Sequence, residues 1–200
     1  SHDVVSQVRR GFKTKKIGHL GTLDPMARGG VPVAVGSYRR LTEYLVDEDK
    51  DYLVEMVFGI VTDTDDLDGQ VVSQTPPSNL TRESIEELLT GFTGEIKQVP
   101  PAFSAVQIDG KRLHKLARQG IIVDAPARDV TVHQLNLLSL SKDNYPKGLF
   151  SAKVGRGTYI RSLARDLGAA LGCGASVSYL LRMRVGGFLL KKAMLLQSVS

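Results

Sequence analysis

Hydrophobic and polar residues recur along this chain with two periods, one typical of helices and one typical of strands. A spacing of three or four residues places apolar side chains on one face of a helix, whereas alternation or a short apolar run indicates a strand. Helix-like patterns cover residues 1–11, 38–45 and 80–92; strand-like patterns cover 31–36, 52–61, 70–74, 128–140 and 176–188; strand-turn-helix patterns cover 103–120 and 148–174.

Residues with strong local preferences mark the ends of these elements. Ser1 and Thr81 are suited to be helix N-caps, and Gly120 is suited to end a helix. The Asp109-Gly110 pair predicts a turn between a strand and a helix. Because helices and strands do not alternate regularly, the pattern favours an α+β fold with a mixed, largely antiparallel sheet and flanking helices.

Length and composition fit one soluble domain. The chain has 200 residues, 42% hydrophobic and 24% charged, and no apolar run approaches the roughly 20 residues of a membrane-spanning helix. We find no internal repeat, linker or signal peptide. A single cysteine cannot form an internal disulfide, so we expect a cytoplasmic protein with no membrane partner.

Charge is distributed unevenly along the chain, whose formal net charge is +5. Residues 1–110 carry 11 Lys/Arg and 17 Asp/Glu, whereas residues 111–200 carry 15 and 4. We therefore expect the second half to be the contact for a polyanion, although a solvated basic face would have the same composition.

Motifs for phosphate and calcium binding are absent or incomplete. There is no G-x-x-x-x-G-K-[ST] loop and no G-x-G-x-x-G between a strand and a helix, so a nucleotide cofactor has no support. The segment from Asp63 has the aspartates of a calcium loop, but its fifth position is Leu67 and its twelfth is Gln74. We interpret residues 63–69 as a solvated turn.

A zinc site and a cysteine nucleophile are equally unsupported. The four histidines, His2, His19, His114 and His133, have no metal-ligand spacing. Cys173 lies between two glycines without a supporting histidine pattern, so we interpret it as a packing residue.

Asp24 lies in a glycine-rich loop, residues 17–30, directly before Pro25. Asp before Pro in such a loop is ordinary turn chemistry, and these residues alone favour a turn role. Tyr52 lies in a predicted strand, where tyrosines are more often core residues. Local chemistry therefore does not decide the function.

Five ordered segments of the chain resemble the motifs of one enzyme family. They are GHLGTLDPMARGGVPVAVG, KDYLVEMVFGIVTDTDDLDGQV, PPAFSAVQIDGKRLHKLARQG, GRGTYIRSLARDLG and LGCGASVSYLLRMRVGGF. In this order they are similar to the catalytic domain of the bacterial tRNA pseudouridine-55 synthases, the TruB family. The resemblance implies the pseudouridine synthase fold and the isomerisation of uridine to pseudouridine in the T-loop of tRNA, without cofactor or metal.

The resemblance also assigns catalytic roles. Asp24 is the implied essential carboxylate, which must be ionised and held beside the ribose, either as a nucleophile or as the base that removes a sugar proton. Arg161 is its implied partner, because a guanidinium favours the ionised carboxylate and orients it through hydrogen bonds. Tyr52 is the implied aromatic residue that stacks on the flipped uracil.

Further residues are implied to bind the substrate. Tyr159 and Leu180 match the walls of the family's pocket, and His19 matches a histidine near the displaced base. Arg182 and Lys115 are expected to bind phosphates without reading bases. The structural alternatives are core packing for Tyr159 and Leu180 and a hydrogen-bonded turn role for His19.

The chain departs from the family pattern in three respects. Arg28 and Gly30 stand where the family usually has a small hydroxyl residue and an aliphatic one, so we expect Arg28 to add a phosphate contact and Gly30 to loosen the loop. The family's N-terminal strand and small C-terminal RNA-binding domain are not found in the sequence. We therefore interpret residues 1–200 as the catalytic domain, acting as a monomer without a protein partner.

Two alternatives remain open. The first is a non-catalytic module that binds or folds tRNA, which would tolerate the loss of Asp24. The second is a synthase of the same family that acts on ribosomal or guide-directed RNA.

Overall fold

A computed structural model describes residues 2–45, 47–108, 110–121, 123 and 125–199. Among these residues, a seven-stranded sheet forms the body, with the strand order β13-β12-β4-β11-β10-β7 and β2 paired to β12. The β2–β12 pair is parallel and the other pairs of this sheet are antiparallel, which confirms the expected mixed, largely antiparallel sheet. The strands are β2 (Arg28–Gly29), β4 (Lys50–Phe58), β7 (Gly94–Gln98), β10 (Arg128–Leu140), β11 (Lys147–Val154), β12 (Ala175–Val185) and β13 (Phe188–Leu189).

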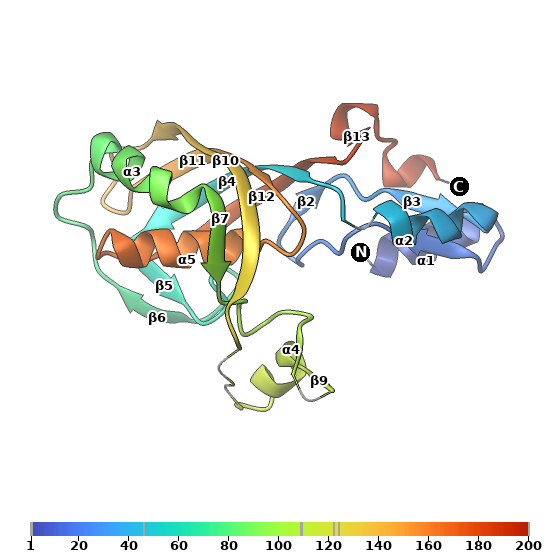
Figure 1. Cartoon of the computed structure of the whole chain (residues 1–200), viewed down its shortest axis with the longest axis horizontal. Helices are drawn as coiled ribbons and strands as arrows, with labels where there is room; N and C mark the ends of the chain where they lie inside the picture. Colours follow the sequence, from blue (N-terminus) through green and yellow to red (C-terminus); the bar gives the residue numbers. More distant parts are fainter. Residues whose placement is uncertain (1, 46, 109, 122, 124, 200) are drawn as a thin grey trace.

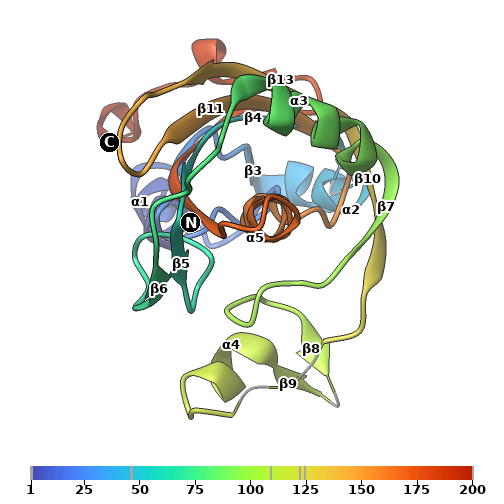
Figure 2. The same cartoon turned by 90° about the vertical axis from the view of Figure 1, so that its left-hand side faces the viewer.

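Two helices supply the apolar faces that complete the main core. Figure 2 shows the sheet curving around α5 (Ile160–Ala170), whose residues Ile160, Leu163 and Leu167 share one helical face and are buried. Helix α3 (Arg82–Leu89) adds Ile85 and Leu89 to the same core. Thr81 caps α3 by accepting a hydrogen bond from the Ser84 backbone, as the sequence predicts.

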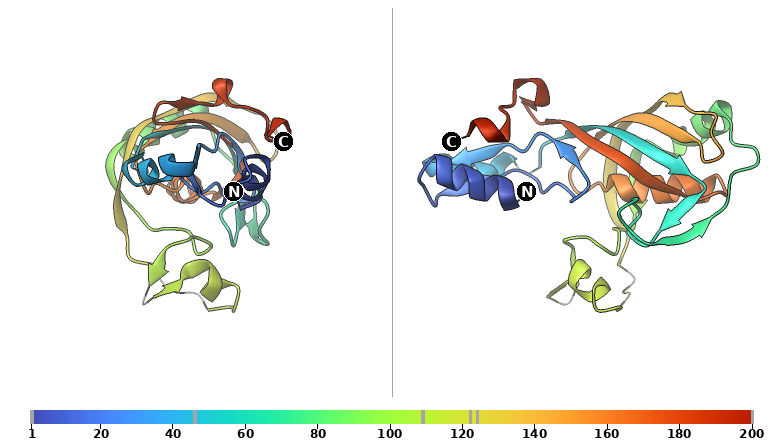
Figure 3. Two further views of the ribbon diagram at one scale, coloured as in Figure 1. Left: turned by 90° about the vertical axis from the view of Figure 1, so that its right-hand side faces the viewer. Right: turned by 180° about the vertical axis from the view of Figure 1, so that it is seen from behind.

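A second lobe lies at the end of the molecule opposite α3 (Figures 1 and 3). Its own small core joins Val5, Val8 and Ile17 to Val33 and Leu196. It is built from α1 (His2–Gly11), β1 (Ile17–His19), β3 (Val33–Val35), the 3-10 helix η1 (Gly36–Leu41), α2 (Thr42–Leu45) and the 3-10 helices η3 (Leu190–Lys192) and η4 (Leu196–Ser198).

Two smaller units extend from the body. One is the hairpin of β5 (Ile60–Thr62) and β6 (Val71–Gln74). The other projects below the body in Figure 1 and contains β8 (Gln107–Ile108), β9 (Lys111–Arg112) and α4 (Leu113–Ala117), packed around Val106, Leu113 and Ala125.

The structure divides one predicted strand and adds another. Residues 52–61 form two strands because Gly59, at φ +87°, turns the chain where a side chain would collide with the carbonyl of Thr75. Strand β7 was not predicted, because Ile96 lies between Glu95 and Lys97 and the strand pairs only with β10 at the sheet edge.

Three other predictions need comment. Residues 38–45 form part of η1 and one turn of α2, and Leu41 and Tyr44 of their predicted apolar face are 47% and 81% exposed. The strand predicted at the start of residues 103–120 is reduced to the two residues of β8. Ser1 as a helix cap and Asp109 of the predicted turn lie outside the described residues.

Candidate active site

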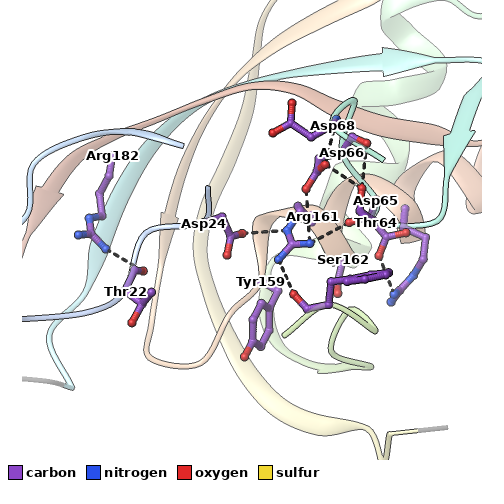
Figure 4. Close-up of polar contacts among 12 residues, drawn as sticks. Thr22, Asp24, Thr64, Asp65, Asp66, Asp68, Tyr159, Arg161, Ser162 and Arg182 are labelled. Atoms are coloured by element: carbon purple, nitrogen blue, oxygen red, sulfur yellow. Dashed lines mark hydrogen bonds and ion pairs between the residues drawn. The ribbon is translucent and has the colours of Figure 1, made fainter. Parts of the chain in front are cut away.

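The Asp24 loop joins β1 to β2 and is held in place by Arg182 from β12 (Figure 4). The Arg182 side chain donates from Nε to the carbonyl of Gly30 at 2.9 Å, from Nη2 to that of Gly21 at 3.1 Å and from Nη1 to that of Thr22 at 3.5 Å. Arg182 is 0% exposed. Its guanidinium therefore fixes both sides of the loop and is not available to a phosphate, which corrects the expected role.

The far end of the loop is fixed by close backbone contact. Gly29 pairs with Arg182 in the parallel β2–β12 register, and its φ of +113° suits glycine alone. A side chain there would collide with the Arg182 carbonyl. The Gly30 N–H donates to that carbonyl at 3.1 Å, so Gly30 does not loosen the loop as expected. Arg28 is exposed, and its expected phosphate contact stays a prediction.

Arg161 brings three segments together at the start of α5. Its Nε donates to Asp24 Oδ2 at 2.8 Å, its Nη1 to the carbonyl of Thr64 at 2.8 Å and its Nη2 to the carbonyl of Phe103 at 3.1 Å. The Arg161 side chain is 3% exposed, whereas that of Asp24 is 31% exposed. The structure thus unites the predicted pair and leaves part of the carboxylate accessible from outside.

A second carboxylate, Asp66, shares the same guanidinium, with its Oδ2 3.4 Å from Arg161 Nη1. Its Oδ1 accepts from Thr64 Oγ1 at 2.7 Å and from the Asp68 N–H at 3.1 Å. The Asp66 side chain is 7% exposed. Residues 63–69 do form a turn in which Asp63, Leu67 and Asp68 are exposed, but the interpretation as solvated is wrong for the buried Asp65 and Asp66. Two adjacent aspartates between two strand-like runs were the signal that the sequence offered for this residue.

Asp65 lies beside Asp66 in a backbone conformation that is rare for non-glycine residues, with φ +62°. Burial raises the pKa of its carboxyl to about 6, although Arg165 and Arg161 act in the opposite direction. Arg165 Nη1 lies 3.2 Å from Asp65 Oδ2, and its Nε lies 2.9 Å from Asp166 Oδ1. A second cluster of charges, with Asp65 buried and Arg165 and Asp166 half-buried, therefore adjoins the Asp24–Arg161 pair.

Two tyrosines lie within electrostatic reach of Asp24. Tyr52 on β4 is the cross-strand partner of Arg182, which places it next to the Asp24 loop. Tyr159 directly precedes α5, and the Gln98 side chain holds its backbone, accepting from its N–H at 2.8 Å and donating to its carbonyl at 3.1 Å. Burial raises the pKa of both phenols, and the charge of Asp24 adds to this shift, so both hydroxyls stay protonated at neutral pH.

The remaining predicted residues are more scattered. Leu180 is 4% exposed and belongs to the main core. His19 is half-buried and is the last residue of β1, directly before the loop that carries Asp24. Lys115 is exposed on α4, in the unit that projects from the body, and does not meet the other residues at Asp24.

Part of the basic surplus of the second half is neutralised by ion pairs with the acidic first half, some buried and some at the surface. Bases from residues 111–200 pair with acids from residues 1–110 in the ion pairs Lys147–Glu55, Lys153–Asp49, Arg156–Asp47, Arg161–Asp24, Arg161–Asp66, Arg165–Asp65 and Arg184–Asp51. The net charge of this half therefore overstates the charge available to a polyanion, but Lys111, Arg112, Lys115 and Arg118 are exposed and form no ion pair within the described residues, so the contact stays a prediction.

Other binding features lie away from Asp24. In the part of the chain that the structure describes, no three His, Cys, Asp or Glu side chains gather as metal ligands, and no helix is long and apolar enough to cross a membrane. A cavity of about 610 Å³ lies between the β6–α3 connection and the end of α5, where burial raises the pKa of the Cys173 thiol. Its lining shares no residue with the Asp24 site.

Comparisons with known proteins identify relatives over the whole chain. Residues 9–160 match the family model described as TruB family pseudouridylate synthase (N terminal domain), and residues 161–200 match the tRNA pseudouridylate synthase B C-terminal domain. The tRNA pseudouridine synthase B of Moorella thermoacetica is 47% identical over 201 residues, which cover 100% of this chain and 66% of that protein. That of Symbiobacterium thermophilum is 46% identical, with 100% and 67% covered. The chain spans about two thirds of the length of these relatives.

Solved structures give the same comparison in three dimensions. A chain in a crystal structure of a Cbf5-Nop10-Gar1 complex matches with a TM-score of 0.70 and 30% identity, over 94% of this chain and 46% of that one. A chain in the archaeal box H/ACA sRNP Nop10-Cbf5 complex matches with a TM-score of 0.70 and 26% identity, over 99% and 48%.

Proposed function

Because this chain belongs to the TruB family of pseudouridylate synthases, we propose that it converts uridine to pseudouridine in the T-loop of tRNA, with Asp24 as the essential carboxylate. One observation carries this proposal. Asp24 Oδ2 accepts a hydrogen bond from Arg161 Nε at 2.8 Å, while 31% of the Asp24 side chain is exposed. A carboxylate that is held on one side and accessible on the other is suited to act on a substrate.

The reaction explains why a positioned carboxylate is needed. The bond from N1 to C1′ breaks, the base turns, and C5 bonds to C1′ while the C5 proton leaves. Asp24 assists the first step as a nucleophile at C1′ or as the base that removes a sugar proton, and both roles require the ionised form. The loop anchored by Arg182 and Gly29 holds this carboxylate in place.

Arg161 and Asp66 serve Asp24 indirectly. Arg161 donates one hydrogen bond to Asp24 and uses its other donors on Thr64 and Phe103, so its guanidinium plane cannot rotate without breaking protein contacts. Asp66 balances part of the guanidinium charge. Arg161 is therefore a positioning residue that holds the Asp24 carboxylate in one orientation.

The surrounding residues bind the base and the RNA. The reacting uridine must leave its loop before C1′ is accessible, at a cost of a few kcal/mol. In our proposal Tyr52 stacks on the extruded uracil, Tyr159 and Leu180 contribute to the walls of its pocket, and His19 contacts the region from which it leaves. Lys115, exposed on α4, contacts a phosphate.

The proposal extends to the enzyme's requirements and setting. Residues 1–200 act as the catalytic unit, as a monomer in the cytoplasm. The isomerisation moves one base within one nucleotide, so it requires no redox carrier, metal or nucleotide cofactor.

Release of tritium from C5 of uridine tests the activity. Formation of the C5–C1′ bond must expel this hydrogen, so the wild type releases tritium from the T-loop uridine of a tRNA transcript. Asp24→Asn keeps the shape of the side chain and removes its charge. We expect it to lower the rate by more than about 10³-fold while RNA affinity stays within about twofold.

Three other outcomes would contradict parts of the proposal. Full activity of Asp24→Asn would return Asp24 to a turn role. RNA binding without tritium release by the wild type would indicate a module that binds or folds tRNA. Release from ribosomal or guide-paired RNA, and not from tRNA, would assign a different substrate to the same chemistry.

A further inference from the structure

The second lobe carries a cluster of exposed basic side chains at its outer end, which we call the basic tip. It consists of Arg9, Arg10, Lys13, Lys15, Lys16, Arg39 and Arg40. Residues 1–41 contain eight Lys/Arg and only two Asp/Glu, a local surplus hidden by the acidic total of the first half. None of the seven side chains forms an ion pair within the described residues, in contrast to second-half bases such as Arg156, Arg161 and Arg184.

The tip is assembled from two segments that the fold brings together. The Gly36 N–H donates to the Lys16 carbonyl at 2.7 Å, which joins the start of η1 to the end of the α1–β1 connection. Figure 1 shows the end of α1 and the start of η1 at the same extreme of the molecule. Arg39 packs beside β1, where it would be the nearest contact of a side chain at Gly18.

Local geometry keeps these charges close to one another. Lys13 takes the left-handed conformation, φ +48°, that ends α1, and the Thr14 N–H returns to the Arg9 carbonyl at 3.3 Å. Arg9, Arg10, Lys13, Thr14 and Lys15 line an open hollow of about 580 Å³. The negative end of the helix dipole favours the positive charges of Arg9 and Arg10 in the last turn of α1. It gives no reason for the lysines that follow the helix.

The tip also exposes two aromatic side chains. Phe12 is 58% exposed and Tyr38 is 68% exposed, and both lie within the same two segments. Exposed aromatic side chains interspersed with Lys and Arg side chains that form no ion pair are typical of nucleic-acid contact surfaces.

We infer that the basic tip binds backbone phosphates of the RNA substrate, several nucleotides from the uridine held at Asp24. This inference rests on the proposed function. Strand β1 leads from Lys16 toward the Asp24 loop, and its three residues alone span about 10 Å. A phosphate at the tip therefore belongs to a nucleotide well outside the pocket, and the contact supplies affinity and orientation without reading a base.

Charge reversal with a matched control tests the inference. Lys15→Glu changes the tip, and Lys142→Glu makes the same change at an exposed lysine between β10 and β11, at the opposite end of the sheet. Fluorescence anisotropy measures the binding of labelled tRNA at several salt concentrations. We expect Lys15→Glu to weaken binding about three- to tenfold and to reduce the slope of log K against log salt by about 0.7 to 0.9, and Lys142→Glu to match the wild type.

Two further measurements separate this inference from the proposed function. A short RNA hairpin that keeps the target loop but only two closing base pairs should bind the wild type more weakly than full-length tRNA does. The wild type and the double variant Lys13→Glu/Lys15→Glu should bind this short hairpin with equal affinity. Tritium release should show an increased KM and an unchanged kcat for Lys15→Glu. Absence of release by the wild type contradicts the proposed function alone, because the binding comparison does not depend on turnover. Equal affinity and salt slope for Lys15→Glu and Lys142→Glu would overturn the inference.

Discussion

The Asp24 site and the basic tip are both rich in arginine, but they use it in opposite ways. Arg161 and Arg182 are 3% and 0% exposed, and their donors lie on carbonyls and carboxylates of the protein. Arg9 and Arg39 at the tip are exposed and have no ion-pair partner within the described residues. Buried arginines therefore position other groups here, whereas the exposed ones remain available to bind an external anion.

The contrast shows that neither residue type nor position in the chain predicts which arginine contacts RNA. A guanidinium whose hydrogen-bond donors are already satisfied gains little from a phosphate, and removing it from those partners leaves buried acceptors unpaired. An exposed guanidinium releases condensed counterions from the RNA when it binds. Substitutions in the basic tip should therefore change the salt dependence of RNA binding, whereas substitutions at the Asp24 site should change catalysis and stability.

Among the substitutions that compare the two groups of arginines, the largest effect on kcat is expected for Arg161→Lys. Lysine keeps the positive charge, but one ammonium cannot replace the three directions in which Arg161 contacts Asp24, Thr64 and Phe103. We expect kcat to fall by about 10²-fold with an unchanged salt slope of RNA binding. Steady-state tritium release and anisotropy measure both quantities. An unchanged kcat would show that charge alone suffices at this position.

Arg182→Met should have the next largest effect and separates the two uses of arginine most directly. It leaves the carbonyls of Gly21, Thr22 and Gly30 without their donor, so we expect the free energy of unfolding to fall by about 2–4 kcal/mol. Urea unfolding measures this loss. A salt slope reduced by about 0.7 to 0.9 with unchanged stability would instead make Arg182 a phosphate ligand.

Asp65→Asn should have the smallest effect and should depend on pH. The pKa of Asp65 is raised to about 6 from 3.8, so the folded state binds a proton more tightly than the unfolded state does. Stability from this group is present at low pH and is lost as pH rises from about 4 through 6. The Asn variant removes this loss, so the difference in unfolding free energy, variant minus wild type, should increase by about 1–3 kcal/mol across that range.

Urea unfolding at pH 4, 5, 6 and 8 measures this difference. Asp68→Asn is the matched control, because it makes the same substitution at an exposed position of the same turn. Equal pH profiles for the two variants would contradict a raised pKa at Asp65.

Much of the fold was predictable because its signals are local. Apolar spacing located α5, β10 and β11, and Thr81 identified the start of α3. Local pattern failed for the polar edge strand β7 and for residues 38–45, whose apolar side chains remain exposed. In both cases tertiary pairing or its absence outweighed the pattern.

The candidate site was predictable in part. Asp24, Arg161 and Tyr52 were implied by the resemblance of five segments, and the structure brings them together from β4, α5 and the β1–β2 loop. Asp66 was missed, because a run of aspartates has the composition of a solvated turn whether or not its side chains are buried. The roles of these residues in catalysis stay predictions.

The sequence by itself determined the order of the elements, the family resemblance and the identity of Asp24 as the carboxylate to test, because periodicity, caps and motifs are properties of neighbouring residues. Only the tertiary structure decided which charges are internal. Asp24 and Arg161 are separated by 137 positions in the chain but by 2.8 Å in space. Contacts between residues so far apart in the chain arise only when the whole chain packs. The sequence alone therefore could not distinguish the buried arginines of the Asp24 site from the exposed arginines of the basic tip.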